Sequence, residues 1–236
     1  MKMIKCKKMM LLFAVMGLAS TSAIKAQDKV EATVGADLVS GYIWRGQDLG
    51  DVSIQPAAGL SYKGFSLSAW GSVGLEGTDT KEFDLTLGYS YGGFSIGVTD
   101  YWFTSTASPT RYSDYKDAHT FEVALGYDFG PLAVNWFTNF AGTVGANEEG
   151  KDTYASYISV SAPFTLGGID WSAEIGATPW ANDFYNGYSD GFKLSAISLQ
   201  ASKEIKVTDS FSLPLWAQAV WNPTTKGAYF VAGISF

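Results

Sequence analysis

Residues 82–104 have the sequence EFDLTLGYSYGGFSIGVTDYWFT, and this stretch decides the fold class. Before the Gly92-Gly93 pair, large apolar residues at odd positions alternate with small or polar residues at even positions. A period of two is typical of a β-strand with one apolar and one polar face. Two such runs joined by two glycines predict a tight antiparallel hairpin.

The same alternation continues through most of the chain, with few runs at helical spacing. We therefore predict twelve strands. The alternation changes phase between Leu194 and Ile197, which predicts a β-bulge near Ala196. The predicted strands comprise residues 30–45, 51–62, 65–76, 82–91, 94–104, 119–129, 131–141, 153–166, 169–180, 192–206, 211–222 and 227–236.

The connections between these strands alternate in length. Tight links contain Lys63-Gly64, Gly92-Gly93, Gly130 and Gly167-Gly168, and longer polar links include 46–50, 77–81, 105–118, 142–152 and 181–191. Short turns at one end and long loops at the other are typical of outer-membrane barrels. We predict an all-β fold, a transmembrane antiparallel up-and-down β-barrel. A secreted β-sandwich is the alternative, because alternation alone is compatible with both.

A membrane barrel should carry apolar residues on its outer face and aromatic residues at the two interfaces. The candidates for the lipid-facing band are Val34, Leu67, Leu85, Val123, Val134 and Ile175. Aromatic residues beside the short turns are Tyr62, Phe65, Phe129, Phe164 and Phe211.

The amino terminus has the pattern of a secretory signal peptide. Lysines precede an apolar run over 9–19, and small and polar residues follow as far as Ala26. We predict a cleaved signal peptide over 1–26 and a barrel domain over 27–236. A retained membrane anchor is the alternative, but the run is too short for a helix to span a bilayer. The predicted location is the outer membrane of a Gram-negative bacterium, and the Gly- and Tyr-rich composition suits Bacteroidota.

Composition excludes several other classes of protein. The 236 residues carry a net charge of −7, with one Cys and one His. The acidic balance argues against nucleic-acid binding, which requires a basic surface. A single Cys, Cys6, and a single His exclude a disulfide scaffold and a Cys/His metal cluster. We expect no cofactor.

The carboxy terminus resembles the assembly signal of bacterial outer-membrane proteins. Phe230, Ala232, Ile234 and Phe236 share one parity, and Phe236 is last. We expect the barrel assembly machinery and outer-membrane lipid, including lipopolysaccharide, as partners. The expected state is a monomer.

Acidic residues outnumber basic residues among those expected to face the barrel interior. We expect most of these acidic residues near the outer mouth, and Asp37 and Glu174 deeper in the barrel. An acidic lumen favours cations, so one hypothesis is a narrow pore or exporter with weak cation preference. The alternative is a filled barrel acting through its outer loops, chiefly 105–118 with its basic and aromatic residues. The lumen candidates are Asp37, Arg45, Glu76, Glu82, Asp84, Glu122 and Glu174.

An enzyme acting on lipid or glycan is a third hypothesis. Glu82, Asp84 and Glu122 could form a carboxylate site, although a polar lumen wall explains them equally well. His119 follows the longest loop, where a lone histidine is more often solvated than catalytic. We therefore predict no enzyme activity and no catalytic residue.

The most distinctive motif is Gly41-Tyr42-Ile43-Trp44-Arg45-Gly46, followed by Gln55-Pro56 and Ala69-Trp70-Gly71-Ser72. It resembles an uncharacterised family of bacterial outer-membrane barrels labelled TorF-like exporters or Gcw-type proteins. The resemblance implies an outer-membrane barrel and transport, without a substrate. We expect Trp44 to anchor at the outer membrane interface and Arg45 to turn into the mouth of the barrel.

Overall fold

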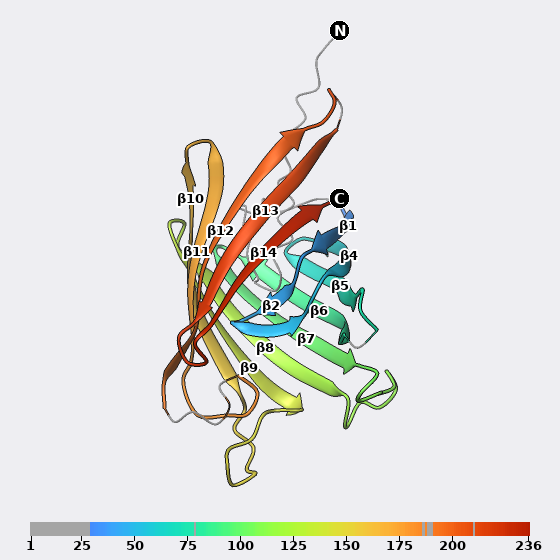
Figure 1. Cartoon of the computed structure of the whole chain (residues 1–236), viewed down its shortest axis with the longest axis vertical. Coiled ribbons are helices and arrows are strands. Elements are labelled where there is room, and N and C mark those ends of the chain that lie inside the picture. Colours follow the sequence, from blue (N-terminus) through green and yellow to red (C-terminus); the bar gives the residue numbers. More distant parts are fainter. Residues whose placement is uncertain (1–28, 78, 186, 188–190, 210) are drawn as a thin grey trace.

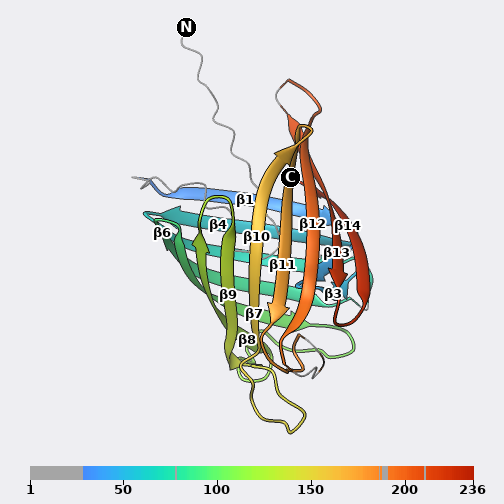
Figure 2. The ribbon, with the colours of Figure 1, turned by 90° about the vertical axis from the view of Figure 1, so that its left-hand side faces the viewer.

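The chain forms one closed antiparallel barrel of twelve strands, in which the last strand pairs with the first (Figure 1). This computed structural model describes residues 29–236 except 78, 186, 188–190 and 210. The barrel strands are β1 (Glu31–Val39), β4 (Ser53–Tyr62), β5 (Phe65–Gly74), β6 (Lys81–Tyr91), β7 (Phe94–Thr104), β8 (His119–Asp128), β9 (Ala133–Gly142), β10 (Ser156–Leu166), β11 (Ile169–Thr178), β12 (Lys193–Lys206), β13 (Ser212–Asn222) and β14 (Gly227–Ser235). Strands on opposite walls cross in Figure 2, as the tilt of a closed barrel requires.

The predicted fold class is confirmed, and most strand boundaries agree within three residues. The long and short connections alternate as predicted, which defines a short-turn end and a long-loop end of the barrel. Lys63 and Gly64 both have positive φ, 48° and 88°, the geometry of the hairpin turn that follows strand twist best. The predicted signal peptide, 1–26, lies outside the described residues.

The outer face of the barrel is apolar. Of the predicted band, Val34, Leu67, Leu85 and Ile175 are exposed, and Val34 is 81% exposed. Aromatic residues at the short-turn end are exposed as well, and Phe65 packs against Tyr89 with ring centroids 4.7 Å apart. Polar and aromatic side chains fill the inner face instead. The sheet therefore has its apolar side outward, the reverse of a soluble barrel.

No helix among the described residues is long and apolar enough to cross a membrane.

The predicted bulge lies at Ser195. Gly176 pairs with Ala196 and Ala177 pairs with Leu194, so Ser195 is the extra residue of β12. A bulge bends its strand and changes the direction of nearby side chains.

The first predicted strand, 30–45, is wrong in its second half. The wall strand β1 ends at Val39, and the chain then forms a separate hairpin of β2 (Tyr42–Trp44) and β3 (Gln47–Gly50). This hairpin, which we call the lumen hairpin, lies within the ring of strands (Figure 1). Tyr42 and Trp44 are each only 4% exposed, because the hairpin packs against the inner wall. The alternating pattern did not distinguish an inserted hairpin from a wall strand.

Candidate functional site

The lumen hairpin crosses the interior near the long-loop end. Arg45 and Gly46 form its two-residue turn, both with positive φ, between the paired residues Trp44 and Gln47. The Asn222 side chain donates to the Gly46 carbonyl oxygen at 3.0 Å. The hairpin leaves the wall between β1 and β4, and its tip contacts β12 and β13.

The tip is close to the backbone of β12, which is the third strand from β1 around the barrel. A Cβ atom on Gly46 would lie 1.8 Å from the Ser195 carbonyl oxygen. Ser195 is the bulge residue of β12, so the backbone that the bulge displaces is the backbone that contacts Gly46. Glycine is needed here both for its positive φ and for the close approach.

Arg45 forms a buried ion pair with Glu122 of β8. Its guanidinium donates to both carboxylate oxygens, at 2.5 and 2.9 Å. The Tyr101 hydroxyl donates to the same carboxylate at 2.9 Å, and Arg45 also donates to the Tyr185 hydroxyl oxygen. A bidentate pair fixes orientation as well as distance. Arg45 therefore turns toward an acid of the lumen wall, as expected.

Aromatic rings surround this ion pair. The Arg45 guanidinium carbon lies 4.0 Å from the centroid of Phe137, 4.5 Å from Trp44 and 4.9 Å from Tyr157. Ring faces attract a cation, and more strongly where water is excluded. Trp44 thus packs inside the lumen, and its expected place at the outer membrane interface is wrong.

A long loop contributes to the same cluster. Tyr185 lies in the loop between β11 and β12 and packs against Trp44 and Tyr157, with centroids 5.7 and 5.9 Å apart. Burial raises the pKa of the Tyr185 hydroxyl, which keeps it neutral and able to donate a hydrogen bond. The loop therefore caps the hairpin from the long-loop end.

A cavity lies between the hairpin and the short-turn end. Arg45 and Trp44 form part of its lining, and Trp216 lies along the wall. Serine hydroxyls, glutamine amides and one carboxylate supply the polar groups, which are Ser159, Ser161, Ser172, Ser198, Gln200, Gln218 and Glu174. Four aromatic residues, Trp44, Phe137, Tyr157 and Trp216, share the lining with these polar groups, so the cavity offers both polar and aromatic surface to a small solute.

Beyond the Arg45–Glu122 pair, four of the lumen candidates lie on the inner wall. Asp37, Glu82 and Asp84 are buried there, and Asp84 lies opposite Tyr101, whose hydroxyl donates to Glu122. Glu174 is half-buried and lines the cavity, where its carboxylate accepts a hydrogen bond from Tyr157 at 3.3 Å. These positions are consistent with a mainly acidic lumen.

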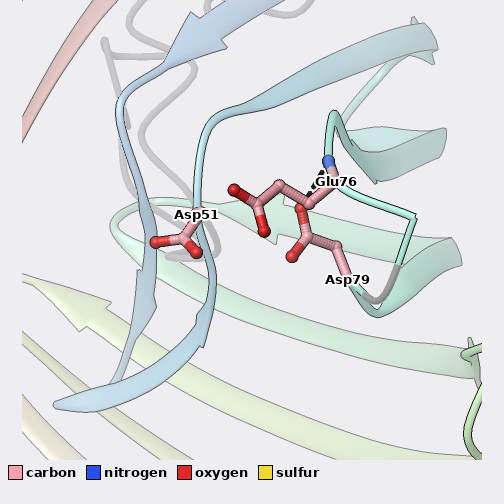
Figure 3. Close-up of side chains that lie close together, drawn as sticks. All are labelled: Asp51, Glu76 and Asp79. Carbon is pink, nitrogen blue, oxygen red and sulfur yellow. Dashed lines mark hydrogen bonds between the residues drawn. The ribbon is translucent and has the colours of Figure 1, made fainter.

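Glu76 is a correction, because it lies outside the lumen. It is exposed in the loop after β5, and it forms a rim cluster with Asp51 and Asp79 at the long-loop end (Figure 3). The Glu76 backbone N–H donates to the Asp79 carboxylate at 3.1 Å. The strand ended two residues earlier than predicted, so the parity that placed Glu76 inside no longer applies.

His119 is also a correction, because it is fully buried rather than solvated. Its Nδ1 lies 2.6 Å from the Asp100 carboxylate and its Nε2 lies 2.8 Å from the Tyr112 carbonyl oxygen. Tyr115 stacks on the ring at 4.2 Å. With both ring nitrogens engaged, His119 fastens the 105–118 loop to the barrel wall.

Tyr42, Trp44 and Tyr185 are lumen residues that were not predicted from the sequence. Trp44-Arg45-Gly46-Gln47 carried a usable signal, since a residue followed by glycine between alternating residues predicts a two-residue hairpin turn. Tyr185 carried no such signal, because its position depends on how a long loop folds back.

Comparisons with known proteins identify a family and a similar solved structure. A solved structure described as a KdgM porin is similar over 88% of this chain and 98% of its own, with 9% sequence identity and a TM-score of 0.45. A search of curated proteins found no match. The sequence profile described as "Bacterial protein of unknown function (Gcw_chp)" matches residues 23–209, which cover the lumen hairpin and most of the barrel. The chain therefore belongs to the Gcw_chp family of bacterial proteins, as the motif around Trp44 had predicted.

Proposed function

We propose that this protein is an outer-membrane channel for small solutes, constricted by the lumen hairpin. One observation carries the proposal. The hairpin crosses the lumen and is fastened by the Arg45–Glu122 pair, and a polar cavity lies beyond it. Solutes passing between the two ends must pass the hairpin, so its position sets the width of the path.

The outer face supports a membrane location. A closed barrel leaves no unpaired sheet edge, which is what a strand protein needs in lipid. The exposed apolar side chains would face hydrocarbon, and the exposed aromatic rings at the short-turn end suit the headgroup level. We place the short-turn end at the periplasm and the long loops outside.

The charge of the lumen supports a preference for cations. Asp37, Glu82, Asp84 and Glu174 lie on the inner side, and Arg45 is already paired with Glu122. Acidic groups in a low-dielectric channel attract cations and repel anions. The expected solutes are therefore small and neutral or positively charged.

A filled barrel that acts through its outer loops is the second candidate. The aromatic packing around Trp44, Tyr101 and Tyr157 supports it, because these rings occupy much of the lumen near the long-loop end. In that case the hairpin would be a permanent part of the core.

Single-channel recording in planar bilayers tests the proposal. In one variant a short Gly-Ser linker replaces residues 41–51, and in a control the same linker replaces the exposed residues 148–150. We expect low conductance for the wild type and the control, and several-fold higher conductance without the hairpin. The current should favour cations, more strongly at low salt, where the Debye length grows to about 30 Å at 0.01 M.

The outcomes separate the two candidates. A folded hairpin-free barrel that passes no current would contradict the channel and favour the filled barrel. Equal conductance of all three proteins would show that the hairpin does not constrict the path. Anion selectivity would contradict the assigned role of the acidic wall.

A further inference from the structure

Two buried carboxylates in the lumen have no positive partner among the described residues. Glu82 and Asp84 stand two apart on β6, so both side chains leave the same face of the strand. They are 5% and 2% exposed. Arg45, the basic residue of the lumen hairpin, is occupied by Glu122, and the ion pairs of the described chain include neither acid.

Their oxygen atoms also lack hydrogen-bond donors. Both Asp84 oxygens and one Glu82 oxygen are buried without a hydrogen bond in the described part of the chain. An ionised carboxylate buried without compensation is very unfavourable, and proteins compensate such charges by pairing or by coordinating a cation. The pair therefore requires a bound positive charge or a retained proton.

Two neutral side chains point to a cation. Gln55 is 2% exposed, and its amide nitrogen reaches the Ser53 and Ser72 hydroxyl oxygens at 3.4 Å, which leaves its carbonyl oxygen unpaired. The strand register places Gln55 opposite Ser72 and Ser72 opposite Glu82. The unpaired side-chain carbonyl oxygen of Gln55 thus belongs to the same row of neighbouring strand positions as Glu82.

Tyr42 of the lumen hairpin covers the group from the inside. Its hydroxyl is buried beside Glu82 and Asp84, close enough to donate to the Glu82 carboxylate, and a tyrosine hydroxyl oxygen that donates can still accept or coordinate. Its ring packs on Trp70 at 5.5 Å, and Trp70 pairs with Asp84 across the sheet. The hairpin, β4 and β6 thereby contribute a hydroxyl oxygen, an amide oxygen and two carboxylates to neighbouring positions of the inner wall.

We propose that Glu82, Asp84 and Gln55 bind a calcium ion beneath Tyr42. Hard divalent cations prefer oxygen ligands, and Ca²⁺ accepts mixed carboxylate, carbonyl and water coordination in flexible geometry. Two carboxylates balance the charge of one such ion. The ion would join β4 and β6 below the base of the lumen hairpin, and this site does not depend on whether the barrel conducts.

Terbium luminescence tests the site in the folded, chelator-treated barrel. Tb³⁺ has ligand preferences like those of Ca²⁺, and Trp70 and Tyr42 are close enough to sensitise it. We expect saturable luminescence that Ca²⁺ displaces. Glu82→Gln and Asp84→Asn should each weaken Ca²⁺ binding by about tenfold or more, because the number of charged ligands sets the affinity of such sites.

The rim cluster provides the matched control. The double substitution Glu76→Gln and Asp79→Asn removes one exposed and one half-buried acid at the same end of the barrel and should leave the luminescence unchanged. If that variant abolishes binding and the β6 variants do not, the ion sits at the rim and the proposal is wrong. If the wild type binds neither Tb³⁺ nor Ca²⁺, the calcium site is also wrong. A proton shared by Glu82 and Asp84 would then compensate their buried charge.

Some β6 variants could fail to fold, which heat-modifiable migration on gels would reveal. Gln55→Met then replaces them, because it removes the amide oxygen at similar volume and leaves both acids in place. The proposal requires weaker Ca²⁺ binding in this variant. Unchanged affinity for Ca²⁺ would remove Gln55 from the ligand set and contradict the site as stated.

Discussion

At the scale of single residues, Gly46 decides how closely the tip of the lumen hairpin can approach β12. Its φ of 82° is rare for residues with a side chain, and its missing Cβ makes room for the Ser195 carbonyl oxygen. The obstructing atom belongs to backbone, so it cannot rotate away. The position of the hairpin tip, and of the Arg45–Glu122 pair beside it, therefore requires that residue 46 have no side chain.

We predict that Gly46→Ala displaces the hairpin tip and lowers the free energy of unfolding by about 1–3 kcal/mol. Urea unfolding of the barrel in lipid vesicles measures this change. Gly50→Ala is the matched control, because Gly50 lies in the same hairpin and a Cβ there meets nothing within 4 Å. Equal stability of the two variants would count against the tight contact at Ser195.

Residue patterns predicted the direction of some side chains and missed that of others. Arg45 was expected to meet an acid, and a buried guanidinium needs one wherever it lies. Trp44 was expected at an interface, because a large amphipathic ring beside a strand end suits the headgroup level. Its actual partners, such as Tyr101 and Tyr185, are distant in sequence, and no local pattern encodes contacts of that kind.

At the scale of elements, the strands were predictable because the outer face of the barrel suits lipid and the inner face is polar. Alternation in β6 and β8 persists over ten residues or more, and a one-residue slip would bring polar side chains outward. The lumen hairpin was not predictable in the same way. The hairpin has protein on both faces, and its side chains alternate as those of a wall strand do. The pattern over 30–45 therefore does not show where β1 ends.

We predict that Val123→Arg impairs folding into bilayers. Val123 is half-buried on the outer face of β8 and lies opposite the exposed Val98 of β7. An arginine near the bilayer midplane costs about 2–4 kcal/mol, because the charge must leave water. Refolding yield and urea midpoints in phosphatidylcholine vesicles measure the loss.

The matched control for Val123→Arg is Thr106→Arg, which adds the same charge to the exposed 105–118 loop. This control should fold as the wild type does. Unimpaired folding of the β8 variant would show that the outer face had been assigned incorrectly.

At the scale of the whole molecule, closure depends on the two ends of the chain. Ala36 of β1 and Phe236 exchange two backbone hydrogen bonds, at 2.9 and 3.3 Å, which extend the short β1–β14 pairing. The Phe236 side chain is 68% exposed, so it contributes little to packing. A terminal aromatic residue on the outer face remains accessible to a protein that would recognise it.

We predict that deletion of Phe236 lowers the amount of barrel in the outer membrane without changing export across the inner membrane. Immunoblots of separated membranes and periplasm measure both quantities. Phe230→Ala is a suitable control, because it removes an exposed ring of the same parity inside β14. Normal outer-membrane levels after the deletion would contradict a role of Phe236 in assembly.

The lumen hairpin also constrains the order in which the protein can fold. Arg45 and Glu122 are 77 residues apart, and Asn222 is 176 residues from Gly46. Contacts of such sequence separation form late, because long chain segments must first be ordered between them. The hairpin is made early in the chain but has nothing to dock on until β8, β12 and β13 stand in the wall. The ring of strands must therefore assemble around an interior that is still open and hydrated, and filling of that interior is the last step of folding.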